Sequence, residues 1–224
     1  MKLAIFDVDG TLVDSSAMIA ASLTTAFKAE GLPVPDQTAM MSIVGLSLVE
    51  AMATLVPGGS RTMHERLGAA YKQAFWEHRA SGNHTEELFE GAHALLTKLR
   101  ARDDVLLGIA TGKSRRGVAH LIETHGFEGW FTTVQTSDDH PSKPHPSMIV
   151  TALAETGLEP SAAIMIGDTS YDIAMARAAG VGAAGVAWGN HPAAELQKAG
   201  AHSISNDFND LERDLNSLWQ DLRA

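Results

Sequence analysis

Short apolar runs that alternate with helical patterns constrain the fold of this chain more than any other feature of its sequence. The runs Val105–Ala110 and Ala162–Gly167 are almost continuously apolar and are bounded by turn residues, a pattern typical of strands buried on both faces. Further strands are predicted over Leu3–Phe6, Phe131–Gln135 and Ala183–Trp188. Helices are predicted over Ala92–Arg102, Arg115–His125, Ser147–Thr156 and Tyr171–Ala179. The alternation predicts an α/β fold, in which a doubly wound parallel sheet of the Rossmann-like type carries helices on both faces.

One region, from Ser15 to about Thr85, breaks this alternation because it contains helical patterns and no convincing strand. Its apolar residues fall into two helical stripes, one of Ile19, Leu23, Ala26 and Phe27, and one of Met63, Leu67, Ala70, Tyr71, Ala74 and Phe75. We therefore expect residues 15–85 to form an all-helical cap domain inserted into a core domain of residues 1–14 and 86–224. The two crossings, at 14–16 and 81–85, are the predicted hinges. A cap at this place in the chain would lie over the end of the first strand.

Two carboxylates, Asp7 and Asp9, follow the first predicted strand directly and precede Gly10. Ligands of open parallel sheets bind at the carboxyl ends of the strands, so both residues are candidates for a nucleophile, an acid/base group or a metal ligand. The alternative is an ordinary turn, since Asp and Gly are common turn formers. Partners at other strand ends decide between these interpretations.

Polar residues also follow the strand that ends at Ala110. The hydroxyl of Thr111 and the N–H groups around Gly112 suit an oxyanion such as phosphate, whereas Ser114 fits a helix N-cap equally well. Lys113 lies in a Gly-Lys-Ser sequence, but the preceding glycine is one residue too close for a nucleotide-binding P-loop. We therefore expect Lys113 to be solvated or to lie at the start of a helix.

Two more strand ends carry charged residues. Lys143 lies between Pro141 and Pro144, and a restricted backbone is useful for aiming a cation at one point. Asp168 follows a strand, and Asp172 comes one helical turn later. Carboxylates at the same edge of the sheet predict a site for a hard cation, and oxygen-only ligands with few protein contacts favour Mg²⁺. The alternative for both aspartates is a helix start, where the helix dipole favours acidic side chains.

Taken in order, Asp7-Val8-Asp9-Gly10-Thr11, Thr111-Gly112, Lys143-Pro144 and Gly167-Asp168 with Asp172 resemble the four motifs of the haloacid dehalogenase superfamily. The helical insertion after the first motif is similar to that superfamily's first cap type. Asp14-Ser15 and the run Leu88-Phe89-Glu90-Gly91-Ala92 resemble its phosphoglycolate phosphatase-like branch. The resemblance spans nearly the whole chain.

The resemblance implies a role for each motif residue. Asp7 is implied as the nucleophile that forms an aspartyl-phosphate, and Asp9 as the general acid and then the general base. Thr111 and the Gly112 backbone would bind the phosphoryl oxygens, and Lys143 would balance the charge on them and on Asp7. The implied Mg²⁺ ligands are Asp7, Asp9 through its backbone carbonyl, Asp168 and Asp172. Gly10, Thr11 and the cap residue Gly45 complete the substrate-binding candidates, although the loop of Gly45 fits a simple helix–helix connection as well.

In the superfamily that this chain resembles, the true dehalogenases and the phosphonate-cleaving members lack an acid at the position of Asp9. The presence of Asp9 therefore favours phosphoester chemistry. We therefore expect a Mg²⁺-dependent phosphatase for a small phosphorylated metabolite, with 2-phosphoglycolate as the first choice. A β-phosphoglucomutase-like phosphotransferase, a pyrophosphatase, and a non-catalytic regulatory member that binds a phosphorylated ligand are the alternatives. Four cap cations fit either a second substrate anion or the solvated face of a helix, namely Arg61, Arg66, Lys72 and Arg79.

Composition excludes several other classes of protein. The net charge of -10, from 17 basic and 27 acidic residues, argues against nucleic acid as a partner. The chain has no cysteine, which excludes a thiol nucleophile and disulfides. The apolar run before Asp7 is too short for a signal peptide, and no stretch approaches the roughly 18 apolar residues of a membrane span. We expect a cytoplasmic protein without a membrane partner, and nothing in the sequence indicates an oligomeric state.

Overall fold

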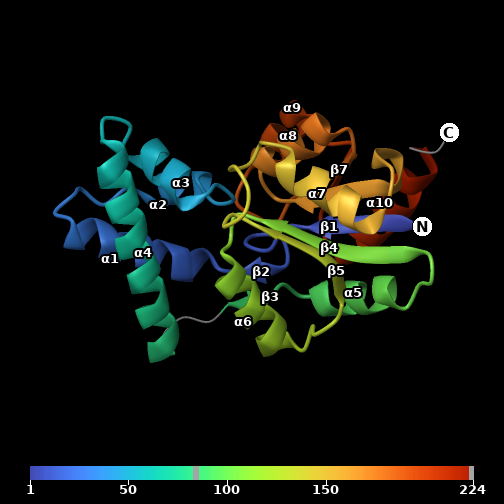
Figure 1. The fold of residues 1–224 in the computed structure, drawn as a ribbon, viewed down its shortest axis with the longest axis horizontal. Coiled ribbons are helices and arrows are strands. Elements are labelled where there is room, and N and C mark those ends of the chain that lie inside the picture. The colour runs from blue at the N-terminus through green and yellow to red at the C-terminus, as the bar shows by residue number, and fades with distance from the viewer. Residues whose placement is uncertain (83–85, 222–224) are drawn as a thin grey trace.

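The computed structural model describes residues 1–82 and 86–221. Within them the chain forms two bodies side by side, a helical body built from residues 16–81 and a larger body built around a sheet (Figure 1). Each body has apolar side chains of its own in its interior. The predicted α/β core with an inserted helical cap is therefore confirmed.

The larger body contains a six-stranded sheet in the order β5-β4-β1-β6-β7-β8, and every neighbouring pair is parallel. Its strands are β1 (Lys2–Phe6), β4 (Val105–Thr111), β5 (Phe131–Thr136), β6 (Ala163–Gly167), β7 (Gly182–Val186) and β8 (Ser203–Ser205). The first strand of the chain lies between β4 and β6, which begin about a hundred residues or more later. The carboxyl ends of β1, β4 and β6 therefore lie next to one another.

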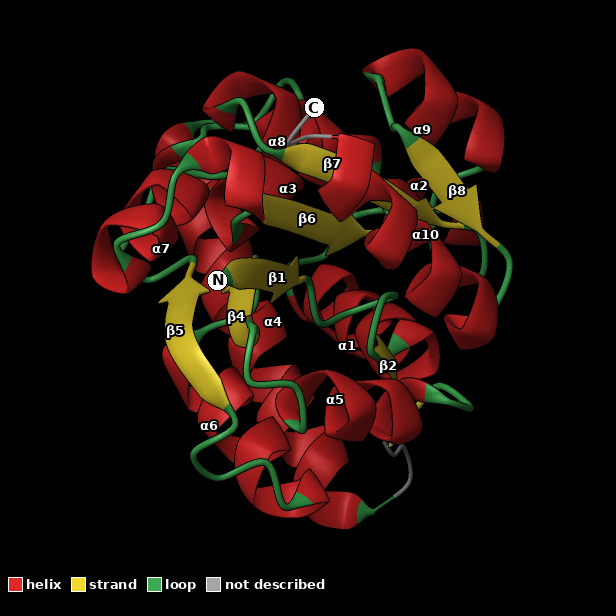
Figure 2. Ribbon diagram, turned by 90° about the vertical axis from the view of Figure 1, so that its right-hand side faces the viewer, coloured by secondary structure: helices red, strands yellow, loops and turns green. Residues whose placement is uncertain are grey.

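Helices cover both faces of this sheet (Figure 2). One layer packs on one face and consists of α5 (Ala92–Arg100), α6 (Arg115–His125) and α10 (Phe208–Asp221). The other layer consists of α7 (Ser147–Thr156), α8 (Ser170–Ala179) and α9 (Ala193–Ala199), and a 3₁₀ turn at Pro160–Ala162 precedes β6. The predicted bounds of α6 and α7 are confirmed. Local sequence signals made these ends predictable. Ser114 accepts a hydrogen bond from the N–H of Gly117, and α6 and α7 end at Gly126 and Gly157 in the left-handed conformation.

The cap consists of α1 (Ser16–Ala29), α2 (Gln37–Ser42), α3 (Leu48–Leu55) and α4 (Arg61–Ser81). The two apolar stripes predicted from the sequence meet in its interior, where Leu23, Phe27 and Leu67 are almost fully buried. Burial of a large aliphatic or aromatic side chain contributes about 1.5 to 3 kcal/mol, so this cluster stabilises the packing of the cap helices on one another.

The two chain crossings between cap and core pair with each other, which the sequence did not indicate. Strand β2 (Val13–Asp14) pairs antiparallel with β3 (Glu87–Leu88). We propose that the domain boundaries predicted at 14/15 and 85/86 lie beside this two-stranded sheet. Residues 83–85 of the predicted second hinge lie outside the described residues.

Strand β8 and helices α9 and α10 were also not predicted. The β8 strand is short and serine-rich, and it lies at the edge of the sheet, so it lacks the continuous apolar run of a central strand. In the part of the chain that the structure describes, no helix combines the length and apolar character needed to cross a membrane.

Candidate active site

A buried ion-pair cluster lies at the carboxyl end of β1. Asp7 directly follows this strand, and its Oδ1 lies 2.9 Å from Nζ of Lys143. The same Nζ donates a hydrogen bond to Oδ1 of Asp172 at 2.6 Å. All three side chains are at most 1% exposed. The lysine predicted to aim at one point thus lies between two of the predicted site carboxylates.

Asp168, which directly follows β6, is held by donors from two other segments. Its Oδ1 accepts a hydrogen bond from the Thr11 hydroxyl at 3.0 Å. Its Oδ2 accepts hydrogen bonds from the backbone N–H and the side-chain amide of Asn190, both at 2.8 Å. Asp168 is fully buried, and these three donors fix the orientation of its carboxylate.

The donor set of these aspartates fits a divalent cation. Carboxylate oxygens of Asp7, Asp168 and Asp172 all lie within 4.8 Å of one another. Both carboxylate oxygens of Asp7 are buried, and neither accepts a regular hydrogen bond from the described residues. Three buried carboxylates beside a single lysine leave uncompensated negative charge, and hard oxygen ligands are those that Mg²⁺ prefers.

The protonation equilibria of the cluster reflect burial first and charge second. Burial raises the pKa of Asp7 to about 6, against the lowering effect of Lys143 and with smaller raising effects of Asp172 and Asp9. Burial, followed by the charges of Asp172 and Asp7, raises the pKa of Asp168 to about 8, although its hydrogen bonds lower it. Burial alone would lower the pKa of Lys143, but Asp172 and Asp7 outweigh it and raise that pKa.

Asp172 fits both interpretations that the sequence left open, a carboxylate of a cation site and an acid at a helix start. It is the third residue of α8, where its carboxylate accepts hydrogen bonds from the N–H and hydroxyl of Thr169 in a capping box. Its other oxygen accepts the hydrogen bond from Lys143. A helix-start acid thus also belongs to the buried cluster.

Gly10 and Thr11 lie against Asp168. A Cβ on Gly10 would lie 2.2 Å from Oδ2 of Asp168, and the φ of Gly10 is +84°, so only glycine suits this position. The N–H of Gly10 donates to the carbonyl of Val13, and that of Thr11 donates to the carbonyl of Val8. These two N–H groups are therefore already used within the turn.

Thr111 and Gly112 lie at the end of β4, as predicted. The Thr111 side chain is buried, and its hydroxyl accepts a hydrogen bond from the N–H of Lys113 at 3.2 Å. Gly112 contacts the cap directly, because a Cβ on it would lie 2.5 Å from the carbonyl oxygen of Gly45. The cap residue singled out from the sequence therefore packs on the second motif.

The prediction that Lys113 is solvated was wrong, whereas the alternative position near a helix start agrees with its place directly before Ser114, the N-cap of α6. Its side chain is only 8% exposed, and its Nζ lies 2.7 Å from Oδ1 of Asp9 and 2.7 Å from Oε1 of Glu86. The carboxylate of Asp9 thus points to Lys113, whereas Asp7, Asp168 and Asp172 form the cluster described above. The error has a physical reason. Asp9 and Glu86 are distant from Lys113 in sequence, so no local sequence pattern predicts their ion pairs with it.

Hydrogen bonds join the α2–α3 region of the cap to the core. The N–H of Ser47 donates to the hydroxyl of Ser142 at 2.8 Å. The carbonyl oxygen of Ser42 lies 3.1 Å from the hydroxyl of Tyr171 and 3.2 Å from Nε2 of His191. These contacts join the α2–α3 region of the cap to the loops that follow β5 and β7 and to the start of α8.

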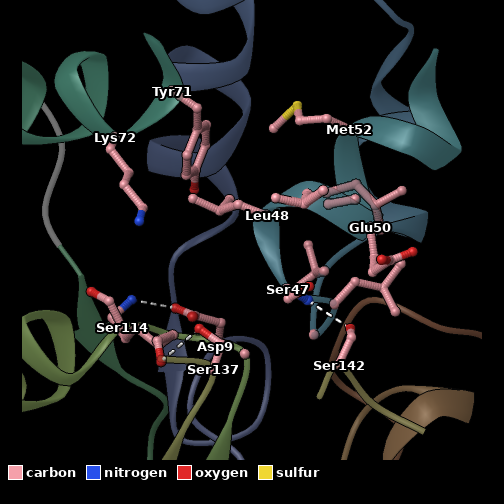
Figure 3. A pocket seen from close by; sticks show the side chains of 18 of the residues that line it. Asp9, Ser47, Leu48, Glu50, Met52, Tyr71, Lys72, Ser114, Ser137 and Ser142 are labelled. Carbon is pink, nitrogen blue, oxygen red and sulfur yellow. Dashed lines mark hydrogen bonds and ion pairs between the residues drawn. The ribbon is translucent and has the colours of Figure 1, made fainter. Parts of the chain in front are cut away.

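A cavity of about 480 Å³ lies between cap and core. Residues on its cap side include Gly45, Leu48, Tyr71 and Lys72, and those on its core side include Asp9, Gly112, Lys113 and Ser142. Figure 3 shows Asp9, Ser114 and Ser137 facing the cap residues Lys72 and Tyr71 across this space. Asp7 is fully buried and is not among the residues that line this cavity.

Sequence reasoning missed Asn190, Ser142, Glu86 and the true environment of Lys113. Asn190 and Ser142 lie in loops after β7 and β5, and a systematic search of the residues following each predicted strand would have included both. Glu86 has no such signal, because it precedes a two-residue strand rather than following a buried one.

Comparison with known proteins is consistent with this geometry. The family model described as "Haloacid dehalogenase-like hydrolase" matches residues 4–186. A protein named "Probable phosphatase IndB" from Dickeya dadantii is 32% identical over 213 residues, which cover 93% of this chain and 91% of that protein. A "Phosphoglycolate phosphatase" from Photorhabdus laumondii is 27% identical over 211 residues, covering 92% of this chain and 88% of its own. The crystal structure of a hydrolase from Pseudomonas syringae superposes with a TM-score of 0.85 at 25% identity, covering 97% of this chain and 99% of that one.

Proposed function

This chain belongs to the haloacid dehalogenase-like hydrolase family and is a phosphatase that acts on phosphoric monoesters, and we propose that it works through Mg²⁺ and a phosphorylated Asp7. The observation that carries the proposal is the buried carboxylate of Asp7. It has no regular hydrogen bond among the described residues, and it lies beside Lys143 and two further carboxylates. A carboxylate in this state is available as a nucleophile and as a metal ligand.

In the first half of the reaction, an Asp7 oxygen attacks phosphorus and the bond from phosphorus to the leaving-group oxygen breaks. Asp9 donates its proton to that oxygen, and the product alcohol leaves. In the second half, water attacks the phosphorus of the aspartyl-phosphate while Asp9 takes up a proton from the water. The bond between phosphorus and Asp7 then breaks, which releases inorganic phosphate and restores the carboxylate.

The other site residues stabilise the transferring phosphoryl group. The Thr111 hydroxyl and the Gly112 N–H would donate hydrogen bonds to its oxygens, and Lys143 would offset the charge that develops on them. Gly10 and Thr11 would shape the phosphate site through Asp168, since their own N–H groups are already hydrogen-bonded. Held by Asp7, Asp168, Asp172 and the carbonyl of Asp9, Mg²⁺ would supply positive charge that reduces the repulsion between carboxylate and phosphate.

The first experiment measures phosphate release from an aryl phosphate with and without Mg²⁺. We expect Mg²⁺-dependent release by the wild type and a loss of at least about a thousandfold in kcat for Asp7→Asn, because the nucleophile is removed. Asp103→Asn, at an exposed position in the loop before β4, is the matched control and should keep wild-type activity. Metal-independent release, or full activity of Asp7→Asn, would overturn the mechanism.

For the substrate we propose a small phosphorylated metabolite that carries a second anion, with 2-phosphoglycolate tested first. Of the four cap cations considered from the sequence, Arg61, Arg66 and Arg79 pair with carboxylates. Lys72 forms no ion pair with any residue of the described ranges, and it lines the cavity. The Lys72 ammonium points from α4 toward the space above Ser114 and Asp9 (Figure 3). Among the four cap cations, we therefore propose Lys72 as the one that contacts the second anion of the substrate.

The size of the cavity requires a broader panel than glycolate alone. A cavity of about 480 Å³ is within the range that holds whole small-molecule ligands. Sugar phosphates and pyrophosphate should therefore be compared with 2-phosphoglycolate by kcat/KM. Formation of an isomeric sugar phosphate without phosphate release would favour the mutase alternative. The phosphatase assignment argues against the non-catalytic alternative.

A further inference from the structure

A chain of four alternating charges connects the cap to Asp9. The guanidinium of Arg79, in the last turn of α4, pairs with Oε2 of Glu86. The other oxygen of Glu86 lies 2.7 Å from Nζ of Lys113, and the same Nζ lies 2.7 Å from Oδ1 of Asp9. Positive and negative groups thus alternate from the cap helix, through the crossing that precedes β3, to the residue proposed as acid and base.

All four side chains are largely removed from solvent, with exposed fractions from 8% to 14%. The Glu86 backbone is fixed to the core, because its carbonyl oxygen lies 3.2 Å from Nε2 of His125 in α6. Its side chain is fixed to the cap by Arg79, whose guanidinium packs 4.6 Å from the Trp76 ring centre and 4.9 Å from that of Phe75. Glu86 is therefore held from both bodies at once.

Fold stability is a poor explanation for this arrangement. Burying ion pairs costs desolvation energy, and apolar residues of similar size often stabilise a protein equally well or better. The chain of charges also ends on Asp9, which lines the cavity where a leaving group would lie. The direction of the Asp9 carboxylate is set by Lys113, and the position of Lys113 is set by its sharing between two carboxylates.

We propose that Glu86 and Lys113 are positioning residues that aim the Asp9 carboxylate at the leaving group when the cap meets the core. This rests on the proposed role of Asp9 as acid and base. Glu86, held by Arg79 of the cap, fixes the Lys113 ammonium, and Lys113 fixes Asp9. When the cap moves away, Arg79 no longer holds Glu86. The Asp9 carboxylate is then no longer fixed toward the leaving group while the site is open to water.

The test compares two substrates that differ in their need for an acid. p-Nitrophenyl phosphate releases a weakly basic phenolate that departs without a proton, whereas an alkyl phosphate releases an alkoxide that requires one. Steady-state kinetics with Mg²⁺ would be measured for wild type, Glu86→Gln, Lys113→Met, the double variant, and Glu90→Gln as an exposed control from the same crossing.

We expect Glu86→Gln to lower kcat about 10- to 100-fold on the alkyl phosphate and less than about threefold on the aryl phosphate, with KM nearly unchanged on both. Because Glu86 acts through Lys113, the double variant should be no slower than Lys113→Met alone. If Glu86→Gln does not fold, Arg79→Lys keeps the charge, shortens the reach to Glu86, and should give the same substrate-dependent loss.

Equal losses on the two substrates would indicate a merely structural role and overturn the proposal, as would unchanged kinetics or additive losses in the double variant. The proposed function fails differently. A wild type that releases phosphate from neither substrate would overturn that function and this proposal together. An active wild type with an unchanged alkyl-to-aryl ratio in Glu86→Gln would overturn this proposal alone.

Discussion

The contact between Gly112 and the cap loop allows a sharp test of how closely cap and core must fit. In Gly112→Ala, the added Cβ would lie 2.5 Å from the carbonyl oxygen of Gly45 and 3.0 Å from that of Leu46. The backbone of Gly112 does not have a positive φ, so alanine itself introduces no conformational strain. The substitution therefore acts as a wedge between the second motif and the cap.

The size of the displacement follows from this contact. Real Cβ contacts essentially never fall below 3.0 Å, and those under 3.4 Å are unusually tight. The cap loop must therefore retreat by about 0.5 to 0.9 Å, the difference between these limits and 2.5 Å. The hydrogen bond from Ser47 to Ser142, now 2.8 Å, would lengthen until little of it remains, at a cost of about 1 kcal/mol.

Such a displacement should affect catalysis more than stability. A misplacement of about 1 Å in an active site lowers rates by about 100-fold, so we expect kcat/KM of Gly112→Ala to fall about 10- to 100-fold. The assay is phosphate release in the presence of Mg²⁺, together with a thermal denaturation curve. Gly58→Ala is the matched control, because no atom lies within 4 Å of its added Cβ and its φ is not positive.

The reasoning would be refuted by a Gly112→Ala protein whose kcat/KM stays within about twofold of the wild type, because cap and core would then tolerate separation by a methyl group. A comparable loss in Gly58→Ala would refute it as well, since that substitution contacts nothing.

Two further predictions concern charge in the site. In metal-free protein, the folded state binds protons on Asp7 and Asp168 more tightly than the unfolded chain, because these pKa values are raised from 3.8 to about 6 and about 8. The free energy of unfolding contributed by these groups should therefore decrease as pH rises from 4 to 8. When unfolding is measured by denaturation at a series of pH values, Asp168→Asn should show a shallower decrease. Equal slopes of unfolding free energy against pH in wild type and variant would contradict the raised pKa of Asp168. Lys72→Met should raise KM for 2-phosphoglycolate about tenfold and leave KM for p-nitrophenyl phosphate nearly unchanged, because only the former carries a second anion. Equal effects on both substrates would argue against Lys72 as the second-anion contact.

The sequence predicted the core well because its signals are local. Strands buried on both faces produce continuous apolar runs, a serine cap marks the start of α6, and glycine caps mark the ends of α6 and α7. The strands at Val105 and Ala163 were therefore found within one residue of their starts. The β8 edge strand at Ser203–Ser205 lacks this pattern, and the two-residue strands β2 and β3 are too short to produce one.

The difference between residues with and without a local sequence signal also applies to the candidate site. Asp7, Asp168 and Thr111 are found by one rule, the position directly after a buried strand or at its end. Lys113 lies two residues beyond the end of β4, and its partners Asp9 and Glu86 lie 104 and 27 residues away in sequence. Pairwise charge compensation over such distances leaves no periodicity to detect. The buried ion pairs of Lys113 therefore become visible only in three dimensions.

The central position of β1 has a consequence for how the protein is made. Strand β1, which ends directly before Asp7, is synthesised before its two neighbours in the sheet, which begin at residues 105 and 163. Parallel neighbours require long crossovers, so contacts between residues distant in sequence dominate the assembly of the sheet and slow its formation. The cap helices lie between β1 and these neighbours in sequence and share an apolar interior of their own. Asp7 is therefore synthesised long before its partners, and the candidate site is complete only after Asp168, Asp172 and Asn190 have been added.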